Sequence, residues 1–190
     1  MASLKRRAFK QQARTGLCGP YAIVNALAQL AVGEFEVARA AAMVRDVASA
    51  QPSGFRAIVR EGADRSQMEL MLASSQAWTE RQGWTPWTWR PYHPIPQRTR
   101  ADLFWTDLSE VIARQGSAAL IGFGDDDTGE AHFEPHWTCI EAIGAKRIRL
   151  FDSDEYEVIR RSETAIRPER GCEIEDCFII ERDPRGPAAE

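Results

Sequence analysis

The chain has 190 residues, a mass of 21.4 kDa and a formal net charge of −4. Its composition, 44% hydrophobic and 27% charged, excludes a disordered or fibrous protein, and its length suits a single core. The sequence therefore predicts one domain over residues 1–183 and a disordered tail over residues 184–190. The basic residues are scattered without a long block, which argues against nucleic acid as a partner.

The cysteines of the chain are too few and too irregularly spaced to hold together a fold of this length. They are Cys18, Cys139, Cys172 and Cys177. No apolar stretch follows the basic residues near the N-terminus, so no secretory signal is expected, and no apolar run reaches the length of a membrane span. We therefore expect a cytoplasmic protein without a membrane partner, whose cysteines are thiols.

Periodic apolar positions predict helices in the part of the chain before residue 116. These helices are expected over residues 18–31, 34–47, 66–82 and 102–115. Ser66 and Glu69 have the spacing of a capping box at the start of the third helix. Residues 83–97 hold four prolines and several aromatic residues, and are predicted to form an extended loop.

Short apolar or alternating runs predict strands in the rest of the chain. The strands are expected over residues 118–123, 137–143, 147–151, 156–159 and 177–180. The glycine-containing turn at residues 144–146 joins two of them as a hairpin. The predicted fold class is therefore α+β, with a helical first part and an antiparallel sheet in the second.

Cys18 stands at the junction between a glycine-containing turn and the first predicted helix. A thiol at a helix N-terminus faces the positive end of the helix dipole, which favours the thiolate that does nucleophilic chemistry. A free cysteine is also a common small core residue, so its position alone leaves both interpretations open.

His136 and Asp152 occupy the open end of the predicted hairpin. His136 begins the strand before the turn, and Asp152 follows the strand after it, sixteen residues further on. If the strands pair antiparallel, the two side chains lie near each other. A carboxylate there can orient an imidazole, which in turn deprotonates a thiol such as that of Cys18. His93 has no carboxylate at such a distance and ranks below His136 as a candidate base.

Gln12 precedes Cys18 by six residues, in the segment that leads into the turn. Its side-chain amide could join the backbone N–H of Cys18 in holding a tetrahedral oxyanion. The neighbouring Gln11 offers the same group, and an ordinary surface glutamine is the alternative interpretation for both.

The segment from Gln12 to Ala22, QARTGLCGPYA, resembles the nucleophile segment of papain-like cysteine peptidases. It is most similar to the C39 group, in which a glutamine, five residues and Cys-Gly open the domain. The segment from His136 to Asp152 resembles the histidine and aspartate segment of the same group. The resemblance covers residues 11–30 and 135–153, and it implies a papain-like fold that acts on a peptide or protein substrate without a cofactor. The implied catalytic residues are Cys18, His136, Asp152 and Gln12.

The resemblance says more about the mechanism than about the substrate. Leu17 before the cysteine and Trp137 after the histidine also resemble Josephin-type deubiquitinases, which use Asn where this chain has Asp152. Papain-like folds also include acyltransferases and deamidases. The sequence therefore predicts a thiol hydrolase acting on a peptide or isopeptide bond. An acyltransferase, a glutamine deamidase and a catalytically silent peptide-binding module remain alternatives.

The candidates for substrate contact are a glycine beside the nucleophile and three tryptophans. They are Gly19, Trp137, Trp87 and Trp89. The aromatic residues of segment 83–97 either line a substrate groove or cover the helical half of the core, and the sequence does not separate these interpretations.

No metal site is expected. The acidic residues 125–127 lack the spacing of a calcium-binding loop. His132 and His136 have the i, i+4 spacing of a helical zinc pair, but Pro135 between them disfavours a helix.

Overall fold

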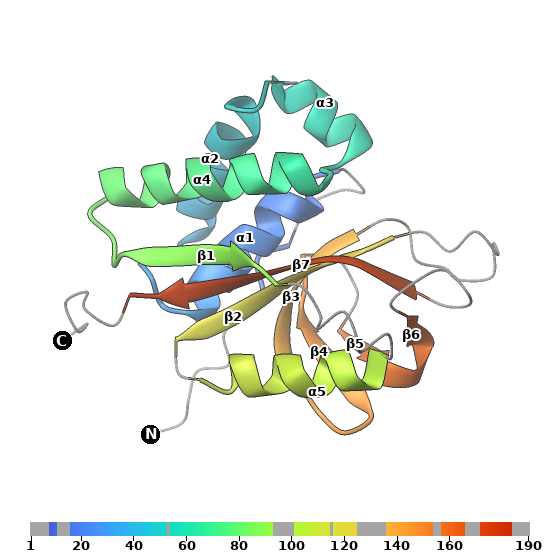
Figure 1. Ribbon diagram of the computed structural model, residues 1–190. Coiled ribbons are helices and arrows are strands. Elements are labelled where there is room, and N and C mark those ends of the chain that lie inside the picture. The colour runs from blue at the N-terminus through green and yellow to red at the C-terminus, as the bar shows by residue number, and fades with distance from the viewer. Residues whose placement is uncertain are drawn as a thin grey trace.

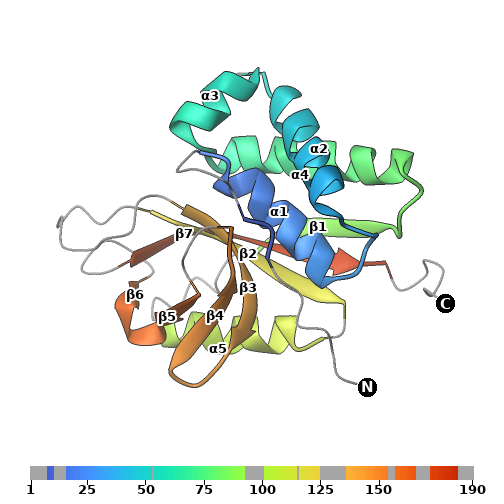
Figure 2. The ribbon, with the colours of Figure 1, turned by 180° about the vertical axis from the view of Figure 1, so that it is seen from behind.

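The computed structural model describes residues 8–10, 16–52, 54–92, 101–114, 116–124, 136–153, 157–165 and 172–183, without the side chains of residues 165 and 172–175. In this part of the chain a mixed sheet, mostly antiparallel, lies between two helical layers (Figure 1). Helices thus cover both faces of the sheet, and the view from behind shows the same division (Figure 2).

The helices are α1 (Cys18–Gln29), α2 (Val37–Ser49), α3 (Gly54–Glu61), α4 (Arg65–Arg81), α5 (Ala101–Ile112) and the short 3-10 helix η1 (Arg161–Glu163). The strands are β1 (Trp87–Pro91), β2 (Ser117–Phe123), β3 (His136–Ile143), β4 (Arg147–Phe151), β5 (Val158–Arg160), β6 (Thr164–Ala165) and β7 (Cys172–Arg182). All four predicted helices and all five predicted strands are present, with ends that differ by a few residues or more.

The strands follow the order β1-β7-β2-β3-β4-β5, and β6 pairs with β7 in parallel. Every other pairing is antiparallel among the residues described. This combination of helices and antiparallel strands confirms the predicted α+β class. The predicted hairpin around residues 144–146 is also confirmed, since β3 and β4 pair across it.

Each face of the sheet contributes to its own apolar cluster. On one face, α1, α2 and α4 pack on alternate residues of β2, β3 and β7, such as Leu120, Cys139 and Phe178. On the other face, α5 packs on the intervening residues, such as Ile121 and Ile140. Successive side chains of a strand point to opposite faces, so a central strand buried on both sides is apolar throughout. The run from Ala118 to Phe123 shows this pattern, and all its residues are buried.

One prediction about the region between α2 and α5 was wrong, and one helix in it was missed. Residues 87–91 form strand β1 rather than a loop, and they pair with β7 at the edge of the sheet. Proline is tolerated on an edge strand, where one side of the backbone needs no partner, and Pro91 stands at the end of β1. The sequence analysis also missed α3, an eight-residue helix of which only Ile58 is fully buried.

The capping box of α4 lies two residues earlier than predicted. The Asp64 carboxylate accepts a hydrogen bond from the Gln67 backbone N–H, and the Gln67 side chain accepts one from the Asp64 N–H, both at 2.8 Å. Ser66 therefore lies inside the helix, and Glu69 forms an ion pair with Arg65 instead. The sequence holds two overlapping patterns of this type, and an aspartate is as good an N-cap as a serine.

Candidate active site

Cys18 is the first residue of α1, as the sequence predicts, and its side chain is buried. The turn before it packs tightly against the end of α3. The Gly16 N–H donates to the Val59 carbonyl at 2.8 Å, and a Cβ on Gly16 would lie 2.2 Å from the Ile58 carbonyl oxygen. Only glycine fits this approach. Helix α1 therefore starts in a fixed place, and its first N–H groups have no partner within the helix.

Gly19, which the sequence analysis names as a candidate for substrate contact, allows α1 to pack closely on α4. A Cβ at this position would lie 2.7 Å from the Met68 sulfur and 3.3 Å from the Ala63 Cβ. Gly19 is buried, so its observed contacts are with the core. Its contact with a substrate stays a prediction.

His136 and Asp152 form a buried pair at the open end of the β3–β4 hairpin. His136 begins β3, and Asp152 directly follows β4. The Nε2 atom of His136 lies 2.8 Å from Oδ2 of Asp152, and the carboxylate side chain is fully shielded from solvent. The proximity predicted from the hairpin is thus confirmed.

The β3–β4 hairpin contains a β-bulge at Glu141. Near the turn the register pairs Ala142 with Arg149, but after the bulge it pairs Ile140 with Leu150 and Cys139 with Phe151. Asp152 follows directly after the last of these pairs.

The side chain of Cys18 also lies near enough to the imidazole of His136 to raise its pKa. Asp152 contacts the Nε2 atom of the ring, so Nδ1 is the nitrogen on its other side. Helix α1 packs directly on β3 and so brings the two residues together, although they are far apart in the sequence. The structure therefore brings Cys18, His136 and Asp152 close enough together for their charges to interact.

The surroundings of His136 favour its protonated form. Burial lowers the pKa of His136, but hydrogen bonds and charges from Asp152 and Cys18 act in the opposite direction and outweigh it. Together they raise the pKa of His136 from 6.5 to about 10. The ring therefore carries a proton at neutral pH, between an anionic carboxylate and a sulfur atom that it can stabilise as thiolate.

Beside His136 and Asp152, two interactions join the start of α4 and the residues before it to the sheet. The indole N–H of Trp137 donates to the Ala63 carbonyl at 2.7 Å. The Arg65 guanidinium lies 2.7 Å from the Asp176 carboxylate on β7, with both side chains partly buried. Trp137 thus has a structural partner at the connection between α3 and α4. Its predicted contact with a substrate remains untested.

Asn25 is a buried polar residue that the sequence analysis missed. It lies on α1, seven residues and about two turns after Cys18, and its side chain is fully shielded from solvent. Its Oδ1 accepts the Phe9 N–H at 2.7 Å, and its Nδ2 donates to the Phe9 carbonyl at 3.3 Å. A polar residue in the middle of an otherwise apolar helix was the available signal, because such a group needs a partner.

The predicted oxyanion residue Gln12 and its neighbour Gln11 lie outside the described residues. Hydrogen bonds fix the chain before and after these two glutamines. The Phe9 N–H donates to the Asn25 side chain, and the Gly16 N–H donates to the Val59 carbonyl. His93, the acidic residues 125–127 and His132 lie outside the description as well.

The two predicted tryptophans of β1 pack against α4. Trp87 is 4% exposed, and its indole N–H donates to the Thr79 hydroxyl at 2.8 Å. Trp89 is partly buried, donates to the Gln76 side chain at 3.0 Å and packs edge-on against Phe178. These contacts support the interpretation that the aromatic residues cover the core. A substrate contact by either ring stays a prediction.

Cys139 and Cys177 differ from Cys18 in their surroundings. Each is a buried free thiol, and burial raises the pKa of both well above the ordinary value. Neither contacts a histidine in the described part of the chain, where Cys139 donates to the Gln29 side chain instead. The side chain of Cys172 lies outside the description. The described residues contain no cluster of ligands suited to a metal ion, and none of their helices has the length and apolar character to span a membrane.

Comparison with known proteins gives weak likenesses to solved structures alone. No family model and no curated protein matches the chain. Among solved structures, the crystal structure of the Pseudomonas avirulence protein AvrPphB is similar, with a TM-score of 0.40 and 12% sequence identity. The match covers 87% of this chain and 90% of that chain. A likeness at this level assigns no activity.

Proposed function

We propose that the chain is a papain-like cysteine peptidase that cleaves a peptide or isopeptide bond. The observation that carries the proposal is the position of the His136 ring, which lies 2.8 Å from the Asp152 carboxylate and whose pKa is raised by both Asp152 and Cys18. A thiol at a helix start, a protonated imidazole and a buried carboxylate are the groups that a thiol hydrolase needs.

The reaction begins when the Cys18 thiolate attacks the carbonyl carbon of the scissile bond. The carbonyl oxygen becomes an oxyanion, held by the Cys18 backbone N–H and the Gln12 amide. As the tetrahedral intermediate collapses, the C–N bond breaks and the His136 imidazolium gives its proton to the departing amine. A thioester on Cys18 remains.

Neutral His136 then takes a proton from water, whose oxygen attacks the thioester. The acid product leaves, and the thiolate and imidazolium are restored. Asp152 stays ionised throughout, because its role is to orient the ring through Nε2 and to stabilise the imidazolium.

The finer features of the proposal rest on the sequence. The resemblance of the segment from Gln12 to Ala22 supports a place for the chain in the C39 group. The predicted partner is a peptide or protein substrate. The residues proposed to contact it are Gly19, Trp137, Trp87 and Trp89. The proposed compartment is the reducing cytoplasm, since the cysteines of the sequence are too few and too irregularly spaced for a disulfide framework.

Alkylation tests the proposal without knowledge of the substrate. On brief exposure to iodoacetamide at pH 6, followed by peptide mass spectrometry, we expect Cys18 to react at least about a hundredfold faster than Cys139 or Cys177. In a His136→Ala variant the rate at Cys18 should fall to that of an ordinary thiol. The proposal is wrong if Cys18 reacts no faster than the other two cysteines in the native protein, or if His136→Ala leaves its rate unchanged.

Product analysis decides between bond cleavage and the other thiol reactions. Incubation of the protein with a library of peptides should produce new peptide termini, detected by mass spectrometry. Release of ammonia, or an amine-linked adduct, without chain cleavage would instead favour a deamidase or an acyltransferase and remove the peptidase assignment.

The oxyanion role of Gln12 is tested by comparing two neighbouring substitutions. Gln12→Ala is expected to lower kcat by about 10²–10³-fold, the usual effect of removing one oxyanion donor, with little change in KM. Gln11→Ala is the matched control and should keep most of the activity. If Gln11→Ala causes the loss and Gln12→Ala does not, the assignment of Gln12 is wrong.

A further inference from the structure

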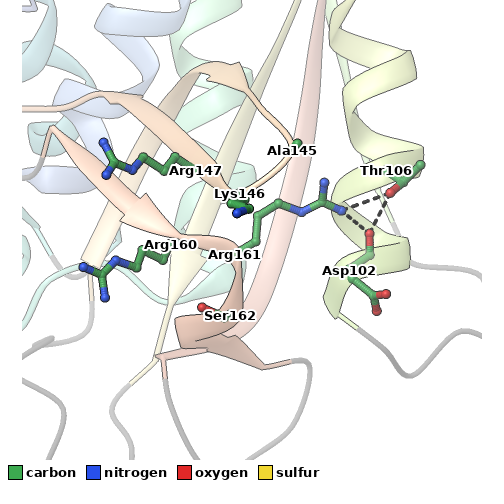
Figure 3. Close-up of a pocket in the computed structure, with 8 residues that line it drawn as sticks. All are labelled: Asp102, Thr106, Ala145, Lys146, Arg147, Arg160, Arg161 and Ser162. Carbon is green, nitrogen blue, oxygen red and sulfur yellow. Dashed lines mark hydrogen bonds between the residues drawn. The ribbon is translucent and has the colours of Figure 1, made fainter.

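The β3–β4 hairpin is attached to a helical layer at each of its ends. At the closed end, the Arg161 guanidinium donates to the Gly144 carbonyl at 3.5 Å and to two groups of α5, among them the Thr106 hydroxyl at 3.0 Å (Figure 3). In the same view Arg147 and Arg160 extend away from Arg161, so the cations around this pocket do not converge on one ligand. The contacts of the closed end thus attach the hairpin to α5.

The open end of the hairpin, which holds the candidate active site, is attached by Trp137. This residue directly follows His136 in β3, and its indole N–H donates to the Ala63 carbonyl at 2.7 Å. Ala63 lies between α3 and α4, in the helical layer that also contains Cys18. The hydrogen bond therefore runs from the residue beside the imidazole to the layer that carries the thiol.

The connection between α3 and α4 is itself fixed on both sides of Cys18. Two residues before the cysteine, a Cβ on Gly16 would overlap the Gly62 backbone. One residue after it, a Cβ on Gly19 would lie 3.3 Å from the Ala63 Cβ. Glycine permits such close approaches of one segment to another. Ala63 therefore has a set position relative to the residue that bears the sulfur.

Packing leaves the Trp137 indole a single position. Gly122 stands directly opposite on β2, and a Cβ there would lie 3.0 Å from the ring. A glycine inside a strand weakens it and often marks a close approach of this kind. The Phe178 ring packs on the indole as well, with ring centroids 5.8 Å apart. Trp137 is only 6% exposed, so little of its surface is open to a substrate.

We propose that Trp137 is a positioning residue, whose hydrogen bond to Ala63 sets the distance between the Cys18 sulfur and the His136 imidazole. This role rests on the proposed function, in which the two groups share a proton and act together. A displacement of about 1 Å between reacting groups can lower a rate about 100-fold. The role differs from a substrate contact, because it operates before any substrate binds.

Alkylation of Cys18 without a substrate tests this role in a Trp137→Phe variant, which loses the indole N–H but keeps an aromatic ring. At pH 6 we expect iodoacetamide to label Cys18 about tenfold or more slowly than in the native protein, because the imidazolium no longer stabilises the thiolate as well. The difference should narrow toward pH 9, where an ordinary thiol ionises by itself. A loss of packing alone would not produce this dependence on pH.

Trp105→Phe is the matched control. The Trp105 indole is also buried and donates to the Thr164 hydroxyl at 2.7 Å, but it belongs to the apolar cluster on the other face of the sheet. This variant loses an equivalent hydrogen bond, and its rate of Cys18 labelling should stay within about twofold of the native rate. A decrease as large as that in Trp137→Phe would overturn the positioning role.

Steady-state kinetics with a cleaved peptide separate positioning from substrate contact. Trp137→Phe should lower kcat with little change in KM, since the substrate still binds but the reacting groups are misplaced. A raised KM with native kcat and native labelling of Cys18 would show that Trp137 only contacts the substrate, and would overturn the role.

Gly122→Ala provides a second test if Trp137→Phe does not fold. It keeps the indole N–H but places a methyl group 3.0 Å from the ring, which must then move. We expect labelling of Cys18 to slow about threefold or more. The role is excluded if a folded Trp137→Phe variant, or Gly122→Ala in its place, labels Cys18 at the native rate. Native Cys18 that labels no faster than Cys139 would instead contradict the proposed function, so the two failures are distinguishable.

Discussion

Replacing Cys18 with alanine is expected to lower kcat/KM for peptide cleavage by at least about 10⁴-fold, because no thioester can form without the sulfur. The decrease should be in kcat, since the rest of the substrate site is retained. The new peptide termini that the native protein produces from a peptide library, counted by mass spectrometry, give the measurement. Cys18→Ala should keep the fold, as alanine fits at a helix start and removes one small side chain.

Cys139→Ala is the matched control for this prediction. Cys139 is another buried free thiol in the same apolar cluster, but its described partner is Gln29 rather than a histidine. We expect this variant to keep most of the activity and to lose about 1 kcal/mol of stability in urea unfolding. The nucleophile assignment fails if Cys18→Ala retains a tenth or more of the native activity.

The elements predicted most accurately from the sequence are those that depend on neighbouring residues. The start of α1 at Cys18 and the turn between β3 and β4 follow from local glycines and from apolar periodicity. Strand β1 was missed because its stability comes from pairing with β7, about ninety residues further along the chain. No local pattern reports such a partner, and prolines in this segment suggested a loop.

In the candidate site, too, the contacts between residues near each other in the sequence were predictable and those between distant residues were not. The hairpin brings His136 close to Asp152, so sequence spacing alone could suggest the pair. The bulge at Glu141, which shifts the register of β3 against β4, has no clear sequence signal, since glutamate is an ordinary surface residue. The meeting of Cys18 with His136 depends on the packing of α1 against β3, and only the resemblance to a known family suggested it.

The polar contacts around the site were the least predictable feature. Asn25 and the ion pair between Arg65 and Asp176 join segments that are distant in the sequence. Their side chains are of types that are common on surfaces, and only the fold shows that they are partly or fully buried. A sequence pattern can indicate that a buried polar group needs a partner, but it does not identify the partner.

The charge of Asp152 is expected to set the alkaline limit of the activity. The native pKa of His136, about 10, lies above the ordinary value of 6.5, so the imidazolium persists through neutral pH. Asp152→Asn keeps an oxygen that accepts from Nε2 but removes the negative charge, so the pKa of His136 should fall toward 6.5. The alkaline decrease of kcat/KM should then move from near pH 10 toward neutral pH, with about 10–100-fold lower activity at pH 8.

The negative charge of Asp152 also makes the stability of the folded protein depend on pH, through the pKa of His136. The pKa of His136 is raised in the folded state, so its contribution is fully present below pH 6.5 and is lost as pH rises toward about 10. Urea unfolding of the native protein should show this decrease between pH 6 and pH 9, and Asp152→Asn should reduce it. Glu141→Gln, which removes a carboxylate from the same hairpin that pairs with Arg149, should change neither profile. An alkaline limit that stays near pH 10 in Asp152→Asn would show that the carboxylate does not hold the proton on His136.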